Sequence, residues 1–171
     1  MNIAFVGNFE RHKGSEIFKK TVKQLKNNHK WYVLGVIKDP GFMLQGIEKY
    51  LSAAHRFQFG KLGDMLRKYE IDLVLLFNML PESFSLTFFE TIDAEIPFIA
   101  FKVGFPPTAF KDYPYFIDLK DTDKISEIIG KLDEEKLKKA KEMIIKYKLE
   151  NFEAMVKKIE KKYEVVDRVL S

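Results

Sequence analysis

The sequence contains no cysteine among its 171 residues, which excludes a disulfide framework and a zinc ribbon. Its three histidines, His12, His29 and His55, lack the spacing of metal ligands, so we predict no structural metal. The chain also lacks a long apolar run and a secretory leader. We therefore expect a cytoplasmic protein that folds without a metal.

Two common phosphate-binding loops are missing as well. No G-x-G-x-x-G follows the first apolar segment, and in Lys13-Gly14-Ser15 the lysine stands in an order that does not fit a P-loop. These absences argue against a dinucleotide-binding protein and against a P-loop protein.

The composition and charge of the chain limit the possible number of domains and the possible partners. With 46% hydrophobic residues the chain can bury a core, and its length favours one domain over residues 1–171. The net charge is +4, and most of the excess lies from Lys131 onward, where both signs alternate. A solvated helical surface explains such a pattern, so we do not expect a nucleic-acid partner.

Short apolar runs alternate along the chain with stretches of helical periodicity, which is typical of a buried parallel sheet. We predict strands at residues 1–7, 31–37, 56–60, 71–77 and 97–101. We predict helices after the first strand, at residues 42–54, around residues 65–69, between residues 83 and 93, and over about 134–170. The predicted fold class is α/β: a Rossmann-like, doubly wound, mainly parallel sheet of about six strands, with helices on both faces and a C-terminal helical tail.

The most informative segment is residues 81–90, which read Pro-Glu-Ser-Phe-Ser-Leu-Thr-Phe-Phe-Glu. Four apolar residues recur at helical spacing and are expected to face the sheet: Phe84, Phe88, Phe89 and Ile92. Ser83 or Ser85 would cap this helix. Glu82 would lie just before the helix and Glu90 two turns inside it, roughly 12 Å apart along the axis. The free amides between the two carboxylates would suit an anion, and a nucleotide sugar has hydroxyl groups at both ends and phosphates between them.

The order of this segment resembles the E-x7-E signature of retaining glycosyltransferases with the GT-B fold, family 4 in particular. That signature reads P-E-x-F-G-x-x-x-x-E and is followed by small residues, a proline and a hydrophobic strand. The resemblance implies that Glu82 contacts the transferred sugar, Glu90 binds the ribose, and the amides of Ser85, Leu86 and Thr87 meet the phosphates. Ser85 departs from the family's usual glycine.

The loop after the first strand is similar to the family's V-G-R-x-x-x-K-G turn. Gly7, Lys13 and Gly14 match this pattern, whereas Asn8 stands where the family has arginine. The resemblance implies that Lys13 neutralises the donor's diphosphate, and Arg11 is a candidate to replace the missing guanidinium. An asparagine offers a neutral amide where arginine offers a charged, bidentate grip, so phosphate affinity is expected to fall.

By position in the family, Lys61 and Leu62 would lie under the nucleobase. Asp121-Thr122-Asp123 matches the D-x-D metal motif of the other large glycosyltransferase fold, but it precedes an apolar helical run, so we interpret it as a helix cap. We therefore predict neither a metal nor a cofactor, and a nucleoside-diphosphate sugar as donor substrate.

The resemblance covers nearly the whole chain but corresponds to the C-terminal half of such an enzyme. It implies that the partner is an N-terminal acceptor domain, in the same or a separate chain. It also implies transfer of a hexose to a glycan or lipid, which this half is expected not to perform alone. Association of the full enzyme with the inner membrane face is a further expectation. The tail would contain a helix at about 134–147 and a final helix with one apolar face. Between them, Asn151-Phe152-Glu153 resembles the short aromatic-containing step that precedes the final helix of GT-B enzymes. The apolar face would comprise Phe152, Met155, Val156, Ile159, Tyr163, Val166 and Leu170.

Three alternatives stay open. Glu82 and Glu90 are solvated helix-end charges in one of them. In another, the chain is a degenerate or non-catalytic scaffold domain that docks a partner through its tail. In the last, it is half of a nucleotide-sugar epimerase or a phosphorylase.

Overall fold

The computed structural model describes residues 1–26, 28–57 and 60–170, and beyond Phe152 it describes the course of the backbone alone. Six parallel strands form one sheet in the order β3-β2-β1-β4-β5-β6. The strands are β1 (Asn2–Val6), β2 (Lys30–Leu34), β3 (Leu51–His55), β4 (Leu73–Leu76), β5 (Phe98–Phe101) and β6 (Phe116–Ile117). This order and direction confirm the predicted doubly wound α/β fold.

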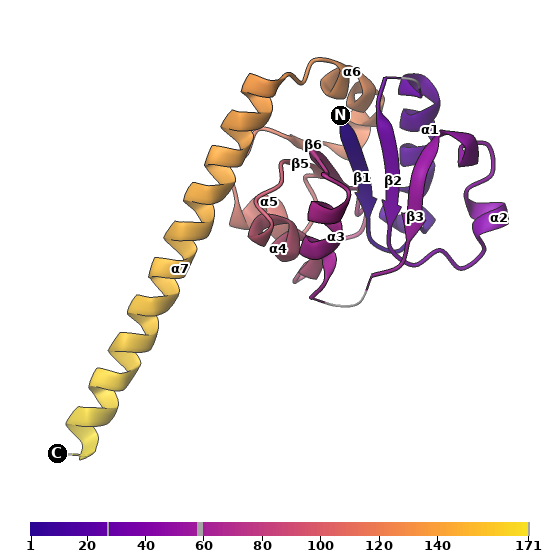
Figure 1. Ribbon diagram of the computed structural model, residues 1–171. Helices are drawn as coiled ribbons and strands as arrows, with labels where there is room; N and C mark the ends of the chain where they lie inside the picture. The colour runs from indigo at the N-terminus through magenta and orange to yellow at the C-terminus, as the bar shows by residue number, and fades with distance from the viewer. Residues whose placement is uncertain (27, 58–59, 171) are drawn as a thin grey trace.

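Helices follow most of the strands (Figure 1). The α-helices are α1 (Ser15–Leu25), α2 (Pro40–Met43), α3 (Leu62–Lys68), α4 (Leu86–Asp93), α5 (Phe105–Ala109), α6 (Ile125–Gly130) and α7 (Glu134–Leu170). Three short 3-10 helices are η1 (Arg11–Lys13), η2 (Glu48–Tyr50) and η3 (Leu119–Lys124).

The alternation of side chains along each strand divides the core into two layers. Ala4 and Val6 of β1 pack on one face, together with buried residues of α3, α4 and α7. Ile3 and Phe5 pack on the opposite face, with buried residues of α1 and α6. Both faces of the sheet are covered, and this explains why the strands read as continuous apolar runs.

Four strands lie close to their predicted positions, but the third does not. The predicted helix over 42–54 is wrong, because Gly46 adopts a left-handed backbone (φ 83) and ends the helical course after α2 and Leu44. The segment that follows forms β3, which pairs with β2. The strand predicted at 56–60 is therefore wrong as well; Gln58 and Phe59 lie outside the described residues.

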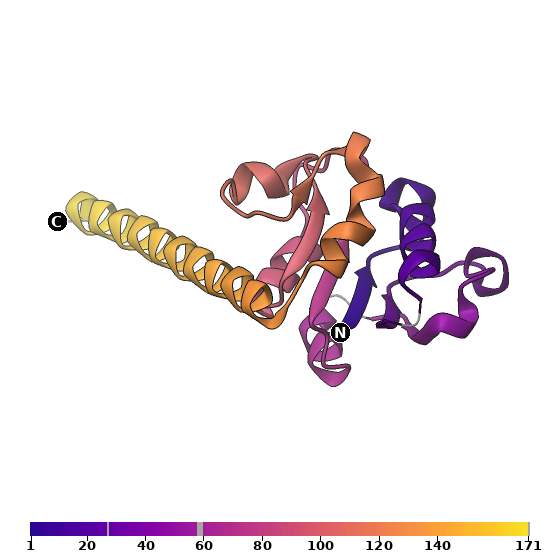
Figure 2. The ribbon, with the colours of Figure 1, turned by 90° about the horizontal axis from the view of Figure 1, so that it is seen from above.

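The C-terminal tail differs from the prediction in one respect. No step interrupts the backbone near residue 151, because α7 runs without a break from Glu134 to Leu170. Figures 1 and 2 both show this helix extending away from the sheet. The apolar face predicted from Met155 onward lies outside the side chains that the structure describes. Within the described part of the chain, none of the helices has the length and apolar content that crossing a bilayer would take.

The predicted cap at residues 121–123 is also wrong. These residues belong to η3, and Lys124 occupies the N-cap of α6 without a capping hydrogen bond. The carboxylate of Asp121 instead pairs with Lys124 at 2.9 Å, and Asp123 pairs with Lys20.

Candidate functional site

A pocket of about 380 Å³ opens at the carboxyl ends of the central strands. β1 and β4 are neighbours in the sheet, but β1 connects outward to β2 and β4 connects the other way to β5. Ligands of open α/β sheets bind at such a switch point. The residues that line the pocket directly follow these two strands: Gly7 and Asn8 after β1, and Phe77 and Asn78 after β4.

Close backbone packing fixes the loop between β1 and α1. Gly14 has φ 80, and a Cβ built on it would lie 2.5 Å from Cβ and 2.6 Å from the carbonyl oxygen of Phe77. The amide of Met79 donates to the carbonyl of His12 at 2.9 Å. Only glycine fits at position 14. The close contact between the two loops holds Lys13 over the end of β4.

A second close contact fixes Glu82. Gly104 has φ 70, and a Cβ built on it would lie 2.6 Å from the amide nitrogen of Glu82. The carbonyl of Glu82 accepts a hydrogen bond from the amide of Phe105 at 2.9 Å. Glu82 therefore lies between the end of β4 and the loop after β5, and its carboxylate lines the pocket.

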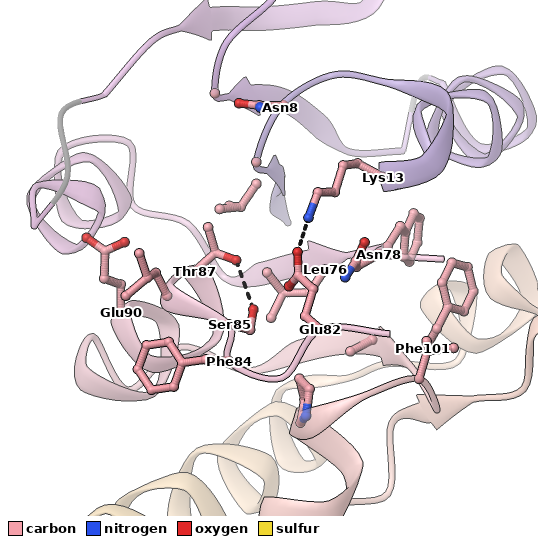
Figure 3. Close-up of a pocket in the computed structure, with 18 of the residues that line it drawn as sticks. Asn8, Lys13, Leu76, Asn78, Glu82, Phe84, Ser85, Thr87, Glu90 and Phe101 are labelled. Atoms are coloured by element: carbon pink, nitrogen blue, oxygen red, sulfur yellow. Dashed lines mark hydrogen bonds and ion pairs between the residues drawn. The ribbon is translucent and has the colours of Figure 1, made fainter. Parts of the chain in front are cut away.

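Lys13 and Glu82 form an ion pair at one end of the pocket (Figure 3). Their side chains are 25% and 29% exposed, so both groups are partly removed from water. The cation that the resemblance assigns to phosphate and the carboxylate that it assigns to the sugar are thus paired with each other in this structure.

Glu90 lines the same pocket from α4. Its Oε1 atom is buried and has no hydrogen-bond partner among the described residues. α4 begins at Leu86, with Ser85 at its N-cap, so Glu90 lies little more than one turn inside the helix. The predicted two turns are wrong because residues 82–85 are not helical, and the helical rise from which the 12 Å separation was calculated does not apply to them.

The N-terminus of α4 points its free amides toward the pocket, which Ser85, Leu86 and Thr87 line. Ser85 makes no capping hydrogen bond; its hydroxyl lies 3.4 Å from that of Thr87. Phe84 precedes the helix and is 57% exposed, so the expectation that it faces the sheet is wrong. Its ring stacks on Phe89 with centroids 4.8 Å apart.

Eight of the eleven predicted site residues line this pocket: Gly7, Asn8, Lys13, Glu82, Ser85, Leu86, Thr87 and Glu90. Arg11 is exposed on η1 and does not line it. Lys61 is exposed and pairs with Asp64, and Leu62 is fully buried in the core. These three residues point elsewhere because η1 and α3 turn their side chains to solvent or to the sheet.

Phe57 and Val36 line the pocket although the sequence did not single them out. Main-chain hydrogen bonds of 3.0 Å from Gly7 to Leu34 and of 2.9 Å from Phe9 to Val36 extend the β1–β2 pairing past the strands. Asn78 was missed too, and its position directly after a buried strand was the available signal. Beside the pocket, the ion pair with Lys38 holds the pKa of Glu10 below its usual value and links the loops after β1 and β2.

Fold and pocket together define a Rossmann-like domain with a pocket at the switch point of a parallel sheet. The chain belongs to the family of glycosyl transferases group 1, whose model matches residues 2–151. Among curated protein sequences none matches.

Solved structures of the same fold include three informative ones. The C-terminal domain of a glycosyl transferase group 1 family protein (LpcC) from Francisella tularensis has a TM-score of 0.70 at 18% identity, over 88% of this chain and 85% of that one. HepE from Anabaena, solved in complex with UDP and glucose, has a TM-score of 0.66 at 13% identity, over 91% and 48%. The catalytic domain of cholesterol-alpha-glucosyltransferase from Helicobacter pylori has a TM-score of 0.61 at 14% identity, over 86% and 97%. The chain thus spans about half the length of HepE.

Proposed function

We propose that this chain is the donor-binding domain of a retaining glycosyltransferase, which uses a nucleoside-diphosphate hexose and a glycan or lipid acceptor. The observation that carries the proposal is the convergence of Lys13, Glu82, Glu90 and the N-terminus of α4 on one pocket. A cation and free helix amides suit a diphosphate, and carboxylates suit the hydroxyl groups on either side of it.

Each side chain has a role in the proposed transfer. Lys13 and the amides of Leu86 and Thr87 stabilise the leaving diphosphate, so that no metal or cofactor is needed. Glu90 accepts hydrogen bonds from the ribose, which would satisfy its unpartnered oxygen. Glu82 orients the sugar for attack.

The proposal includes a second domain. HepE is about twice as long as the segment that this chain matches, which supports an acceptor domain in the same or a separate chain. Transfer then requires that domain, and the described chain binds donor without turning it over. The absence of cysteine supports a cytoplasmic location, with access to the inner membrane face where the acceptor is a lipid.

Calorimetric titration of the chain with UDP, GDP and ADP, and then with their hexose conjugates, tests donor binding without added metal. UDP comes first because HepE was solved with UDP and glucose. We expect saturable binding of one nucleotide that Glu90→Ala weakens about 10- to 100-fold, the range for a hydrogen bond to a charged group.

Asp93→Ala is the matched control. Asp93 is a carboxylate on the same helix, but it is exposed and pairs with Lys148 rather than lining the pocket. Asp93→Ala should leave nucleotide binding unchanged. Failure of every nucleotide and conjugate to bind would contradict the proposal and favour a scaffold domain.

A further inference from the structure

Asn78 carries a side chain whose orientation is fixed. It lies just past β4, lines the pocket, and donates from Nδ2 to the carbonyl of Leu80 at 2.8 Å. A carbonyl oxygen can only accept, so the amide must turn its nitrogen toward Leu80 and its Oδ1 away.

This Oδ1 atom is shielded from solvent and accepts no hydrogen bond within the described residues. Five side-chain polar atoms share this condition in the part of the chain that the structure describes, and two of them, in Asn78 and Glu90, belong to residues that line the pocket at the switch point. Buried polar groups are almost always paired in native structures, so an unpaired acceptor in a pocket indicates a missing donor.

The surroundings of Asn78 indicate which donor that is. The contacts of Gly14 with Phe77 and of His12 with Met79 flank Asn78 on both sides in sequence and bring it next to Lys13. Figure 3 shows Asn78 beside Glu82 and Lys13, while Glu90 lies across the pocket. Asn78 therefore lies at the diphosphate and sugar end of the proposed donor. Phosphate oxygens accept hydrogen bonds at neutral pH, so they cannot satisfy another acceptor.

We propose that Oδ1 of Asn78 accepts a hydrogen bond from one hydroxyl group of the transferred sugar, and that Asn78 thereby contributes to the choice of sugar. The inference rests on the proposed function. The side chains of Lys13 and Glu82 are partly exposed and lie at the same end of the pocket as Asn78, so a diphosphate bound to Lys13 would bring the attached sugar to this end.

Calorimetry with Asn78→Ala tests the contact. Affinity for the nucleotide sugar should fall about 3- to 10-fold, as for one neutral hydrogen bond, and affinity for the free nucleoside diphosphate should not change. Ser83→Ala is the matched control, since Ser83 is exposed beside Glu82 and does not line the pocket. It should change neither affinity.

Donor analogues that each lack one hydroxyl identify the group. One deoxy analogue should bind the unmodified chain and Asn78→Ala equally well, because the partner of Oδ1 is already gone. Asn78→Asp keeps an acceptor oxygen, so it should still prefer the full sugar to that analogue even though its added charge weakens binding of both.

Equal losses for the free nucleotide and the nucleotide sugar would overturn the inference, because they would mean that Asn78 supports the loop or Lys13. Unchanged affinity in Asn78→Ala, or a difference that persists with every deoxy analogue, would overturn it too. All of these results leave the donor-domain proposal intact. If the unmodified chain binds no nucleotide at all, both the donor-domain proposal and the inference about Asn78 are contradicted.

Discussion

Substitution of Glu82 by glutamine should tighten the binding of free nucleoside diphosphate. The Glu82 carboxylate pairs with the ammonium of Lys13, the group proposed to bind phosphate. The substitution keeps the size of the side chain but removes its charge. It therefore frees Lys13 before the ligand arrives and removes a negative charge from beside the bound diphosphate.

The size of the gain follows from these two effects. An ion pair between groups about one quarter exposed contributes about 0.5–1 kcal/mol, the upper range for surface pairs. Removal of the repulsion between carboxylate and phosphate contributes about as much at high effective dielectric constant. Together, about 1–2 kcal/mol corresponds to a Kd that falls about 5- to 30-fold.

Calorimetry at low ionic strength measures this gain, which should shrink as salt is added. The gain should fall to about half, in free energy, in a Lys13→Met background, because no cation is left to be freed and only the removal of the carboxylate–phosphate repulsion remains. The nucleotide sugar should not share the gain, since it loses the proposed contact with Glu82. Glu10→Gln is the control, because Glu10 undergoes the same charge change in the neighbouring loop but pairs with Lys38 outside the pocket. Weaker or unchanged binding of the free nucleotide to Glu82→Gln would refute the reasoning.

Three further substitutions test other parts of the structure. Gly14→Ala should lower the free energy of unfolding by more than about 2 kcal/mol in denaturant titrations, because its Cβ would lie 2.5 Å from that of Phe77 at φ 80, whereas Gly130→Ala, with open space around it, should be neutral or mildly stabilising. Burial raises the pKa of Tyr113 well above its usual value, so the unfolded chain loses this proton first above about pH 10, and unfolding free energy should fall there by about 1.4 kcal/mol per pH unit from this group. Tyr113→Phe should flatten that alkaline slope, and an unchanged slope would contradict the assignment. Asn8→Arg should tighten nucleotide binding about 10-fold by placing a guanidinium at the pocket, and a salt-independent effect would count against phosphate as its partner.

The sequence predicted the sheet well because buried parallel strands have a strong local signal. β1, β4 and β5 are continuous apolar runs, and their burial on both faces allows few other interpretations. β3 was missed because it is an edge strand, largely exposed, and its Leu-Ser-Ala-Ala-His sequence favours a strand only through pairing with β2. The conformation of such a segment depends on its pairing with a neighbouring strand, and the local sequence pattern does not reveal that pairing.

The residues of the candidate site were also predicted only in part. Lys13, Glu82 and Glu90 were predicted because a motif ties them to the strand ends, and they line the pocket. Leu62 was assigned by position in the family, but α3 directs its side chain into the core. The pairing of Lys13 with Glu82 joins residues 69 positions apart, so it could be read only from the folded chain.

Glu95 adopts a left-handed backbone conformation (φ 59) just after α4. Such a conformation disfavours residues other than glycine. The carboxylate of Glu95 pairs with Lys148 of α7 at 3.2 Å, and this contact helps to hold the strained residue in place.

The long C-terminal helix α7 is attached to the domain through the first part of its length. Its 37 residues span about 55 Å, and the described contacts with the domain lie near its beginning. Lys148 grips the end of α4 through Asp93 and Glu95, and Tyr147 packs edge-on against Phe88 of the same helix. Tyr147 also stacks on Phe110, just after α5, with ring centroids 4.4 Å apart. The first part of α7 therefore joins α4, the helix that carries Glu90, to the segment after β5, so a displacement of α7 would act on both sides of the pocket's rim.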